Sequence, residues 1–358
     1  MIAVVTGGRG QGGQLMIKLL RSKGYTIISV VRETTQTSLS SVEFHDCSHF
    51  EIYVDLYDGY SVLSFFRAVA AKAETFVKSD FAKYPIEIYH LMCEKQGILS
   101  YEDPRTSIES SFQTTLNVLE SIRSLKEETK CCFAMVFAGS SEMFGDAQSS
   151  PQNELTEFSP KSPYAVGKVL ASKVCTLYRE LFKIRASTCI LYNHESNLRC
   201  IRFVSRKIIR PAANYMLNKT SEILWVGNLS SQRDWSHAYD IIQGLHLALS
   251  YEDTQDFILA MGEPHMVREF ISVAFKVVGV NIVWKGSGLN EVGIEKRTNS
   301  IIVKVEPTLF RENAEMPCLF GDIRKATSLL GWKKKYNFEG MVETMVLEEI
   351  KNISHHAQ

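Results

Sequence analysis

Tyr164 and Lys168 are the residues of this sequence best suited by type and spacing to do chemistry. On a helix, side chains at this spacing project from one face. A lysine ammonium near a tyrosine favours the tyrosinate form, which can exchange a proton with a substrate hydroxyl. A tyrosine and a lysine also meet at this spacing by chance, as a packed ring and a surface charge. The apolar run Phe133–Ala138 ahead of them, with hydroxyls after it, favours the catalytic interpretation.

Two further polar side chains, Ser140 and Glu142, come directly after that apolar run. Ser140 can hydrogen-bond the same substrate oxygen as Tyr164. A simple dehydrogenase needs only a proton relay, whereas an enzyme that removes water beside a new ketone also needs a base for the acidified proton. The alternative for Glu142 is a loop carboxylate satisfied by backbone amides. We predict Ser140, Glu142, Tyr164 and Lys168 as the catalytic residues.

A glycine-rich turn near the start of the chain indicates a nucleotide site. Gly7, Gly10 and Gly13 lie between an apolar run and a helical pattern. Glycine there permits a tight turn and lets the backbone approach a pyrophosphate at the helix N-terminus. A plain tight turn is the alternative, but the position between strand and helix favours dinucleotide binding.

The next two strand ends predict which dinucleotide binds. Arg32 ends the second predicted strand, where an arginine can accept the 2′-phosphate of NADP, although Glu33 beside it would repel that phosphate. Asp55 ends the third predicted strand and is expected to contact the adenine, or else to cap the following turn. We predict NADP as the cofactor.

Strand and helix patterns alternate through residues 1–190. The predicted strands are Ile2–Val5, Thr26–Val31, Ile52–Asp55, Glu87–Leu91, Phe133–Ala138 and Ala186–Tyr192. The predicted helices between them are Gly13–Lys23, Ser61–Ala73, Ile108–Leu125 and Ser162–Phe182. Apolar strands that alternate with helices predict an α/β fold with a Rossmann-type, doubly wound parallel sheet.

Beyond residue 190 the alternation loosens. Helical patterns at 203–217, 238–249, 266–278, 323–330 and 338–351 are separated by turns and short strands. We predict a smaller, partly interleaved C-terminal substrate domain over 191–351, with segments that return to the sheet, and a frayed tail at 352–358.

Composition narrows the class of protein. Lys plus Arg and Asp plus Glu both number 40, so a protein that coats nucleic acid or an anionic membrane is not favoured. No apolar run is long enough for a membrane span. The eight cysteines form no CxxC pair, which predicts reduced thiols rather than a metal site or a disulfide framework. With no signal peptide at the N-terminus, we expect a cytoplasmic protein.

A series of short segments runs along nearly the whole chain: TGGRGQGG, EIY, SSEMFG, PQNELTEFSPKSPYAVGK, YNHES, FVSRKI, GNL, RDW, GD and LGW. Taken in order, these segments resemble the GDP-mannose 4,6-dehydratase family, a family of extended short-chain dehydrogenase/reductases. The family implies a lyase that converts GDP-mannose to GDP-4-keto-6-deoxymannose, on the route to GDP-fucose, by transient hydride transfer to NADP. Tyr164 would deprotonate the C4 hydroxyl, Glu142 would remove H5, and Ser140 stands where the family has a threonine.

The resemblance also implies further contacts. Gln11, Leu56 and His194 would contact the cofactor. Arg206 lies at a family position near the phosphates of the cofactor or of GDP. The residues implied to bind the nucleotide sugar are Asn193, Glu195, Arg199, Lys207, Arg233, Arg311 and Glu315. Arginine suits bidentate phosphate contact. The family further implies a homodimer or homotetramer.

Departures from the family pattern fall around the predicted cofactor and sugar. A pair of small alanines becomes Met92-Cys93, and Lys95 replaces a serine expected near the sugar. Bulk at Met92 should clash with the cofactor or narrow the sugar pocket. Two alternatives to the dehydratase follow: a non-catalytic or weakly active relative that binds a nucleotide or a protein partner, and another nucleotide-sugar enzyme, an epimerase or reductase, which would not need Glu142.

Overall fold

The structure is a computed structural model that describes residues 1–32, 39, 45, 48–76, 85–92, 99–217, 222–310 and 319–355. A seven-stranded sheet forms its larger lobe, in the order β11-β6-β5-β4-β1-β2-β3, and every neighbouring pair is parallel. The strands are β1 (Ile2–Thr6), β2 (Thr26–Val31), β3 (His49–Tyr53), β4 (Ile86–His90), β5 (Phe133–Ala138), β6 (Arg185–Leu191) and β11 (Phe257–Leu259). The prediction of a Rossmann-type parallel sheet is confirmed.

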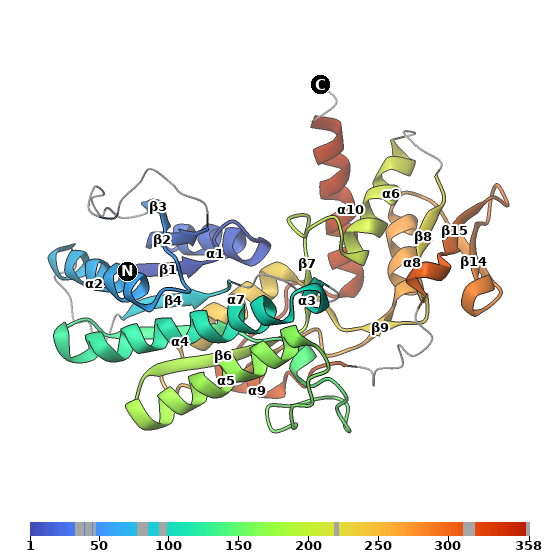
Figure 1. Ribbon diagram of the computed structural model, residues 1–358. Coiled ribbons are helices and arrows are strands. Elements are labelled where there is room, and N and C mark those ends of the chain that lie inside the picture. The colour runs from blue at the N-terminus through green and yellow to red at the C-terminus, as the bar shows by residue number, and fades with distance from the viewer. Residues whose placement is uncertain are drawn as a thin grey trace.

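Helices cover both faces of this sheet (Figure 1). On one face lie α2 (Gly59–Phe76), α4 (Pro104–Glu128) and α5 (Pro163–Phe182); on the other lie α1 (Gln11–Ser22), α7 (Ala238–Ser250) and α9 (Arg324–Leu330). Because both faces are covered, β1, β2, β4 and β5 are buried along their whole length, which explains their continuous apolar runs. A short helix, α3 (Leu99–Glu102), precedes α4.

The smaller lobe has its own core, at the right of Figure 1. Its four-stranded sheet runs β13 (Ile282–Lys285), β14 (Val292–Glu295), β15 (Ile301–Val305) and β8 (Leu224–Val226). The core also includes side chains of α6 (Val204–Met216), α8 (Val267–Val277) and α10 (Phe338–His355). Two short ladders complete the described pairing: β7 (Asn193–Glu195) with β10 (Trp235–His237), and β9 (Gln232–Arg233) with β12 (His265–Met266). Among the described residues, no helix is long and apolar enough to cross a membrane.

Three element predictions need correction. β3 begins at His49 rather than Ile52, because its outward side chains are polar and hide the alternation. The sheet has a seventh strand, β11, which is too short to recognise without its partner β6. The predicted frayed tail continues α10 to His355.

The order of the strands fixes where a ligand can bind. β1 lies between β4 and β2, so the chain leaves β1 at the point where the strand order reverses. In open parallel sheets, ligands bind at such a switch point, beyond the carboxyl ends of the strands. The turn after β1 and the segment after β4 meet there.

Candidate active site

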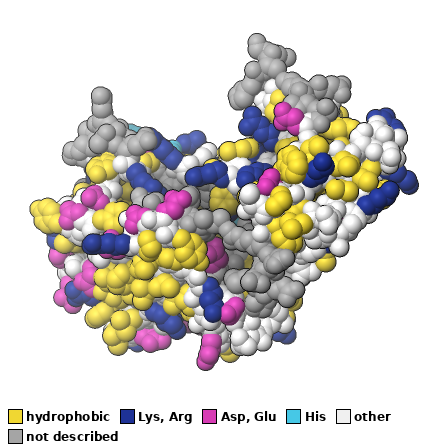
Figure 2. Space-filling model, turned by 45° about the vertical axis from the view of Figure 1, so that its right-hand side comes forward, with side chains coloured by type: hydrophobic (Ala, Val, Ile, Leu, Met, Phe, Trp, Pro, Cys, Tyr) yellow, Lys and Arg dark blue, Asp and Glu magenta, His cyan; other side chains and the backbone are white. Residues whose placement is uncertain are grey.

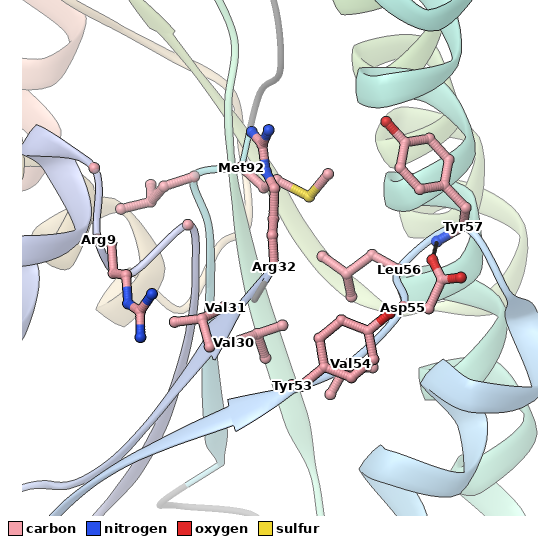
Figure 3. A pocket seen from close by; sticks show the side chains of 14 residues that line it. Arg9, Val30, Val31, Arg32, Tyr53, Val54, Asp55, Leu56, Tyr57 and Met92 are labelled. Atoms are coloured by element: carbon pink, nitrogen blue, oxygen red, sulfur yellow. Dashed lines mark hydrogen bonds between the residues drawn. The ribbon is translucent and has the colours of Figure 1, made fainter. Parts of the chain in front are cut away.

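A cavity of about 470 Å³ opens at this switch point (Figure 3). We call it the glycine-turn cavity; its lining residues are Gly7, Gly8, Arg9, Gly10, Val30, Val31, Arg32, Tyr53, Val54, Asp55, Leu56, Tyr57, Leu91 and Met92. Gly7 has a φ of 73°, which favours glycine, and a Cβ there would stand 3.2 Å from the Met92 backbone. A Cβ on Gly13 would stand 2.3 Å from the Gly7 carbonyl oxygen, so larger residues would break the turn.

The N-terminus of α1 lies beside this cavity. Gly10 occupies the N-cap position, and no side chain among the described residues caps the helix. The first N–H groups of a helix lack intrahelical partners and carry a partial positive charge, so they suit an anion such as a pyrophosphate. The glycines, the uncapped helix and the cavity therefore fit a dinucleotide cofactor.

Two arginines line the cavity, Arg32 at the end of β2 and Arg9 in the glycine-rich turn. Arg9 also forms an exposed ion pair with Glu51 of β3, with Nη2 and Oε2 3.0 Å apart. Arg32 was predicted from the sequence to meet the cofactor, whereas Arg9 was not. A cation inside a glycine-rich phosphate turn was the signal that could have found it.

Met92 and Asp55 also line the cavity (Figure 3). Met92 is only 5% exposed, and it belongs to the hydrophobic core under the cavity together with Val30 and Leu56. Asp55 lies beyond the end of β3, where its Oδ1 accepts a hydrogen bond of 3.0 Å from the Tyr57 N–H, as expected of a turn cap. The residues at 93–98, which include the altered Cys93 and Lys95, lie outside the described part of the chain.

The predicted catalytic residues lie in the turn after β5, where Ser140 caps η2 (Ser141–Met143), and on α5. We call Ser140, Glu142, Tyr164 and Lys168 the catalytic wall. Ser140 is buried, and its Oγ accepts a hydrogen bond of 3.2 Å from the Glu142 backbone N–H, so the turn after β5 holds the Ser140 side chain. η2 packs against α5, which carries the other two residues.

Lys168 is buried against the end of β5. Its Nζ donates a hydrogen bond of 2.7 Å to the Ala138 carbonyl oxygen and stands 5.8 Å from the centre of the Tyr164 ring. Burial, and then the charge of Lys168, lower the pKa of His90 to about 3, so this histidine is neutral. The His90 ring bonds Thr6 and Thr114, which ties β1, β4 and α4 together behind the wall.

Glu142 has the environment of a base that is held partly out of water. Burial raises the pKa of its carboxyl above the ordinary range, while a hydrogen bond from Ser162 and the charge of Arg233 lower it. The Ser162 Oγ donates to Glu142 Oε2 over 3.3 Å. Arg233 belongs to β9, so a cation of the smaller lobe acts on the carboxylate of the larger one.

Arg233 is followed by a residue that fixes its strand. Asp234 is buried and accepts hydrogen bonds from the Met261, Gly262 and Gly321 N–H groups at 2.5, 2.9 and 3.2 Å. These three groups lie after β11 and before α9, so Asp234 holds β9 against the larger lobe.

The predicted run Asn193-His194-Glu195 forms strand β7 rather than a simple turn. Gln11 of the glycine-rich turn joins it: the Gln11 Nε2 donates to the His194 carbonyl over 3.0 Å, and its Oε1 accepts from Ser196 over 2.8 Å. Burial, followed by the charge of Arg199, lowers the pKa of His194 to about 4. Since its Nδ1 lies 2.9 Å from the Tyr192 carbonyl, Nδ1 carries the proton and Nε2 is an acceptor.

Not every predicted substrate residue faces open space. Glu195 is 2% exposed and accepts a hydrogen bond from Ser205 at 2.5 Å; its Oε2 lies 3.6 Å from the Arg199 Nε.

Arg206 forms a buried ion pair of 2.9 Å with Glu349 of α10, so the charge of its guanidinium is neutralised inside the protein. Lys207, next along α6, is exposed. Arg311 and Glu315 lie outside the described residues.

A hollow separates the two lobes on the face shown in Figure 2, and Lys and Arg side chains gather along it. The catalytic wall and β9 contribute to the site from opposite lobes. A parallel sheet with a glycine turn at its switch point and a Tyr–Lys pair on a following helix defines a Rossmann-type nucleotide-dependent protein.

The family model for GDP-mannose 4,6 dehydratase matches residues 4–345. The GDP-mannose 4,6-dehydratase of Sinorhizobium fredii is 34% identical over 98% of this chain and 96% of its own length. GDP-mannose 4,6 dehydratase 2 of Caenorhabditis elegans is 34% identical over 98% of this chain and 89% of its own. The chain therefore belongs to the GDP-mannose 4,6-dehydratase family, as its motifs predicted.

Solved structures share the fold. The dTDP-glucose 4,6-dehydratase of Bacillus anthracis, in complex with NAD, has a TM-score of 0.72 and 15% identity, over 99% of this chain and 98% of that one. The protein RMD of Pseudomonas aeruginosa, complexed with NADPH, has a TM-score of 0.72 and 16% identity, over 98% and 99%. At such low identity they show the fold alone.

Proposed function

We propose that this protein is a GDP-mannose 4,6-dehydratase, a lyase that forms GDP-4-keto-6-deoxymannose. The observation that carries the proposal is the partly buried carboxylate of Glu142, hydrogen-bonded by Ser162 at the start of the helix that presents Tyr164. A net redox enzyme, or an epimerase that inverts only C4, has no use for that second base, whereas a dehydratase must remove the proton next to the transient ketone. The names of the relatives support the same substrate.

Within the proposed reaction, each residue of the catalytic wall has one task. Tyr164 takes the proton of the C4 hydroxyl, and Ser140 hydrogen-bonds the same oxygen. Lys168 stands beside the Tyr164 ring and favours its anionic form. Glu142 removes H5 and delivers that proton to the C6 hydroxyl, which leaves as water, and a proton from the solvent later restores C5. A nicotinamide cofactor held at the glycine-turn cavity would supply the hydride chemistry, as acceptor from C4 and donor to C6.

We propose NADP rather than NAD as that cofactor. Arg32 and Arg9 line the same cavity, and a guanidinium binds a 2′-phosphate in bidentate fashion. Gly7, Gly10 and Gly13 would hold the pyrophosphate, Asp55 and Leu56 the adenosine, and Tyr164, Lys168, Gln11 and His194 the nicotinamide end. Titration by calorimetry should give tighter binding of NADP than of NAD, and equal affinities would contradict the proposal.

For the nucleotide sugar, we propose a division of the chain into 1–190 for the cofactor and 191–351 for the GDP-sugar. Arg199, Lys207 and Arg233 would meet the diphosphate and sugar, as would Asn193. Glu195 would act through Arg199. Arg311 and Glu315 retain the roles that the family implies.

The decisive experiment is incubation of the purified protein with GDP-mannose and NADP. We expect a 4-keto-6-deoxy product, identified by mass spectrometry and by carbon-13 NMR of the ketone. A bound cofactor with no product would favour the non-catalytic alternative. Conversion in which Glu142→Gln retains full activity would favour an epimerase or reductase.

We further propose a homodimer or homotetramer in which α5 meets a second copy. Leu170, Leu177 and Leu181 recur at helical spacing on α5 and are 40%, 47% and 64% exposed. Figure 2 shows apolar side chains gathered on the lower left of the larger lobe. Light scattering should give at least a dimer, and the double variant Leu177→Lys/Leu181→Lys should reduce its mass. An unchanged mass would contradict this interface.

Finally, we propose that the protein acts in the cytoplasm. The free thiols of Cys131, Cys175 and Cys189 are buried, as expected of a protein kept in a reducing compartment. Fluorescent tagging followed by microscopy tests this placement, and a secreted product would contradict it.

A further inference from the structure

We propose that Ser162 is a positioning residue for the base Glu142, which it aims and keeps ionised through a single hydroxyl. This inference rests on the proposed function, because it assigns a role to a residue that supports Glu142. Ser162 is not among the residues that the motif analysis placed in the catalytic set.

The geometry that carries the inference is a hydroxyl used in two directions. The Ser162 Oγ donates its one proton to Glu142 Oε2 over 3.3 Å. The same oxygen accepts a hydrogen bond of 3.1 Å from the Ala165 N–H and so caps the N-terminus of α5. Because the helix cap fixes the position of the oxygen, the proton has a defined direction toward the carboxylate.

This arrangement distinguishes the two oxygens of Glu142. Oε2 is engaged by Ser162, while the backbone N–H of Glu142 is held by Ser140. A hydrogen bond donated to one carboxylate oxygen favours the ionised form. Oε1 is then the oxygen that takes the C5 proton from the substrate.

The position of Ser162 in the chain adds a second consequence. Ser162 is the N-cap of α5, and Tyr164 lies in the first turn of the same helix. One hydroxyl therefore joins the residue that acts on C4 to the residue that acts on C5. Loss of the hydroxyl should separate these two steps, since Tyr164 still has its helix while Glu142 loses its anchor.

Three variants test the role. Ser162→Gly removes the donor, and glycine is tolerated at an N-cap with little loss of stability. Ser162→Thr keeps a hydroxyl at the same atom and is the matched control. Glu142→Gln removes the carboxylate base altogether and shows the largest loss of activity to expect.

With GDP-mannose and NADP, we expect kcat of Ser162→Gly to fall about tenfold and KM to change less than about twofold. Oxidation at C4 continues, so the absorbance of reduced cofactor should accumulate during turnover, and uptake of deuterium at C5 from heavy water should slow. Ser162→Thr should restore all three values. Equal losses in Ser162→Thr and Ser162→Gly, or a loss without accumulated reduced cofactor, would overturn the proposal.

A measurement without substrate separates this inference from the proposed function. Among the described residues, the other charged group that acts on the Glu142 carboxyl is Arg233 from β9. Carbon-13 NMR of labelled glutamate carboxyls, assigned with Glu142→Gln, gives the titration of Glu142 directly. Ser162→Gly should move that titration, and the acid limb of the kcat profile, to higher pH. An unmoved titration overturns the role of Ser162, whereas absence of product from the unaltered protein overturns only the proposed function.

Discussion

The catalytic wall and the glycine-turn cavity hold their polar groups in opposite ways. In the wall, Lys168 is bonded to Ala138, and Glu142 to Ser162, all within one strand–turn–helix segment. In the cavity, Arg9 and Arg32 are exposed and come from separate elements. Core packing therefore fixes the wall, while the charge of the cavity depends on surface contacts that substitutions can adjust.

The largest expected effect is on the wall itself. Tyr164→Phe removes the group proposed to take the C4 proton, so product formation should fall by about 10²–10⁴-fold. Cofactor binding should remain, because the cavity is built from other elements. Steady-state assays of product and calorimetry with NADP measure the two properties. A loss below about tenfold would mean that the wall is not the centre of the reaction.

A substitution at Met92 tests whether this buried side chain restricts the size of the cavity and so the affinity for NADP. Met92→Ala truncates a buried side chain and should cost about 2–5 kcal/mol of unfolding free energy, measured by urea denaturation. It also enlarges the cavity, so NADP should bind at least as tightly as before. Met345→Ala, buried in the core of the smaller lobe, is the matched control for stability. If both variants weakened NADP binding equally, the effect would be global rather than local.

Arg233 couples the smaller lobe to the wall through charge. Glu142 acts as a base only when ionised, so activity is present above its pKa and is lost as pH falls through it. The charge of Arg233 lowers that pKa, and Arg233→Ala should therefore move the acid limb of kcat to higher pH. Arg297→Ala, an exposed arginine beyond β14, should leave the limb in place. A limb that stays fixed in Arg233→Ala would show that the lobes are not coupled in this way.

The smallest expected effect is on the surface contacts of the cavity. Glu51→Gln removes the carboxylate paired with Arg9, so NADP should bind about two- to fivefold more tightly at low salt. Glu128→Gln breaks the comparably exposed ion pair with Arg67, which lies far from the cavity, and should leave the affinity for NADP unchanged. Calorimetry at two salt concentrations checks both. Tighter NAD binding of the same size would show that the 2′-phosphate is not the group that Arg9 meets.

Much of the larger lobe could be predicted because its signals are local. β2 and β5 match their predicted bounds, since a strand covered on both faces is a continuous apolar run. β11 could not be found, because three residues become a strand only through pairing with β6. The start of β3 was missed because His49 and Glu51 interrupt the apolar run.

The site divides in the same way. The spacing of Tyr164 and Lys168, the glycine turn and the presence of Glu142 were visible in the sequence because each is a short-range pattern. Arg9 and Ser162 were not singled out, because their roles depend on Glu51 and Glu142, which are distant in the chain.

By itself, the sequence determined the class of fold, the family and the residue types that can do the chemistry, because periodicity and motifs are written along the chain. Only the tertiary structure decided that Glu195 and Arg206 face internal partners, that Met92 is part of the core, and that Ser162 meets Glu142. The physical reason is that a side chain's charge and direction are set by what burial and packing place beside it.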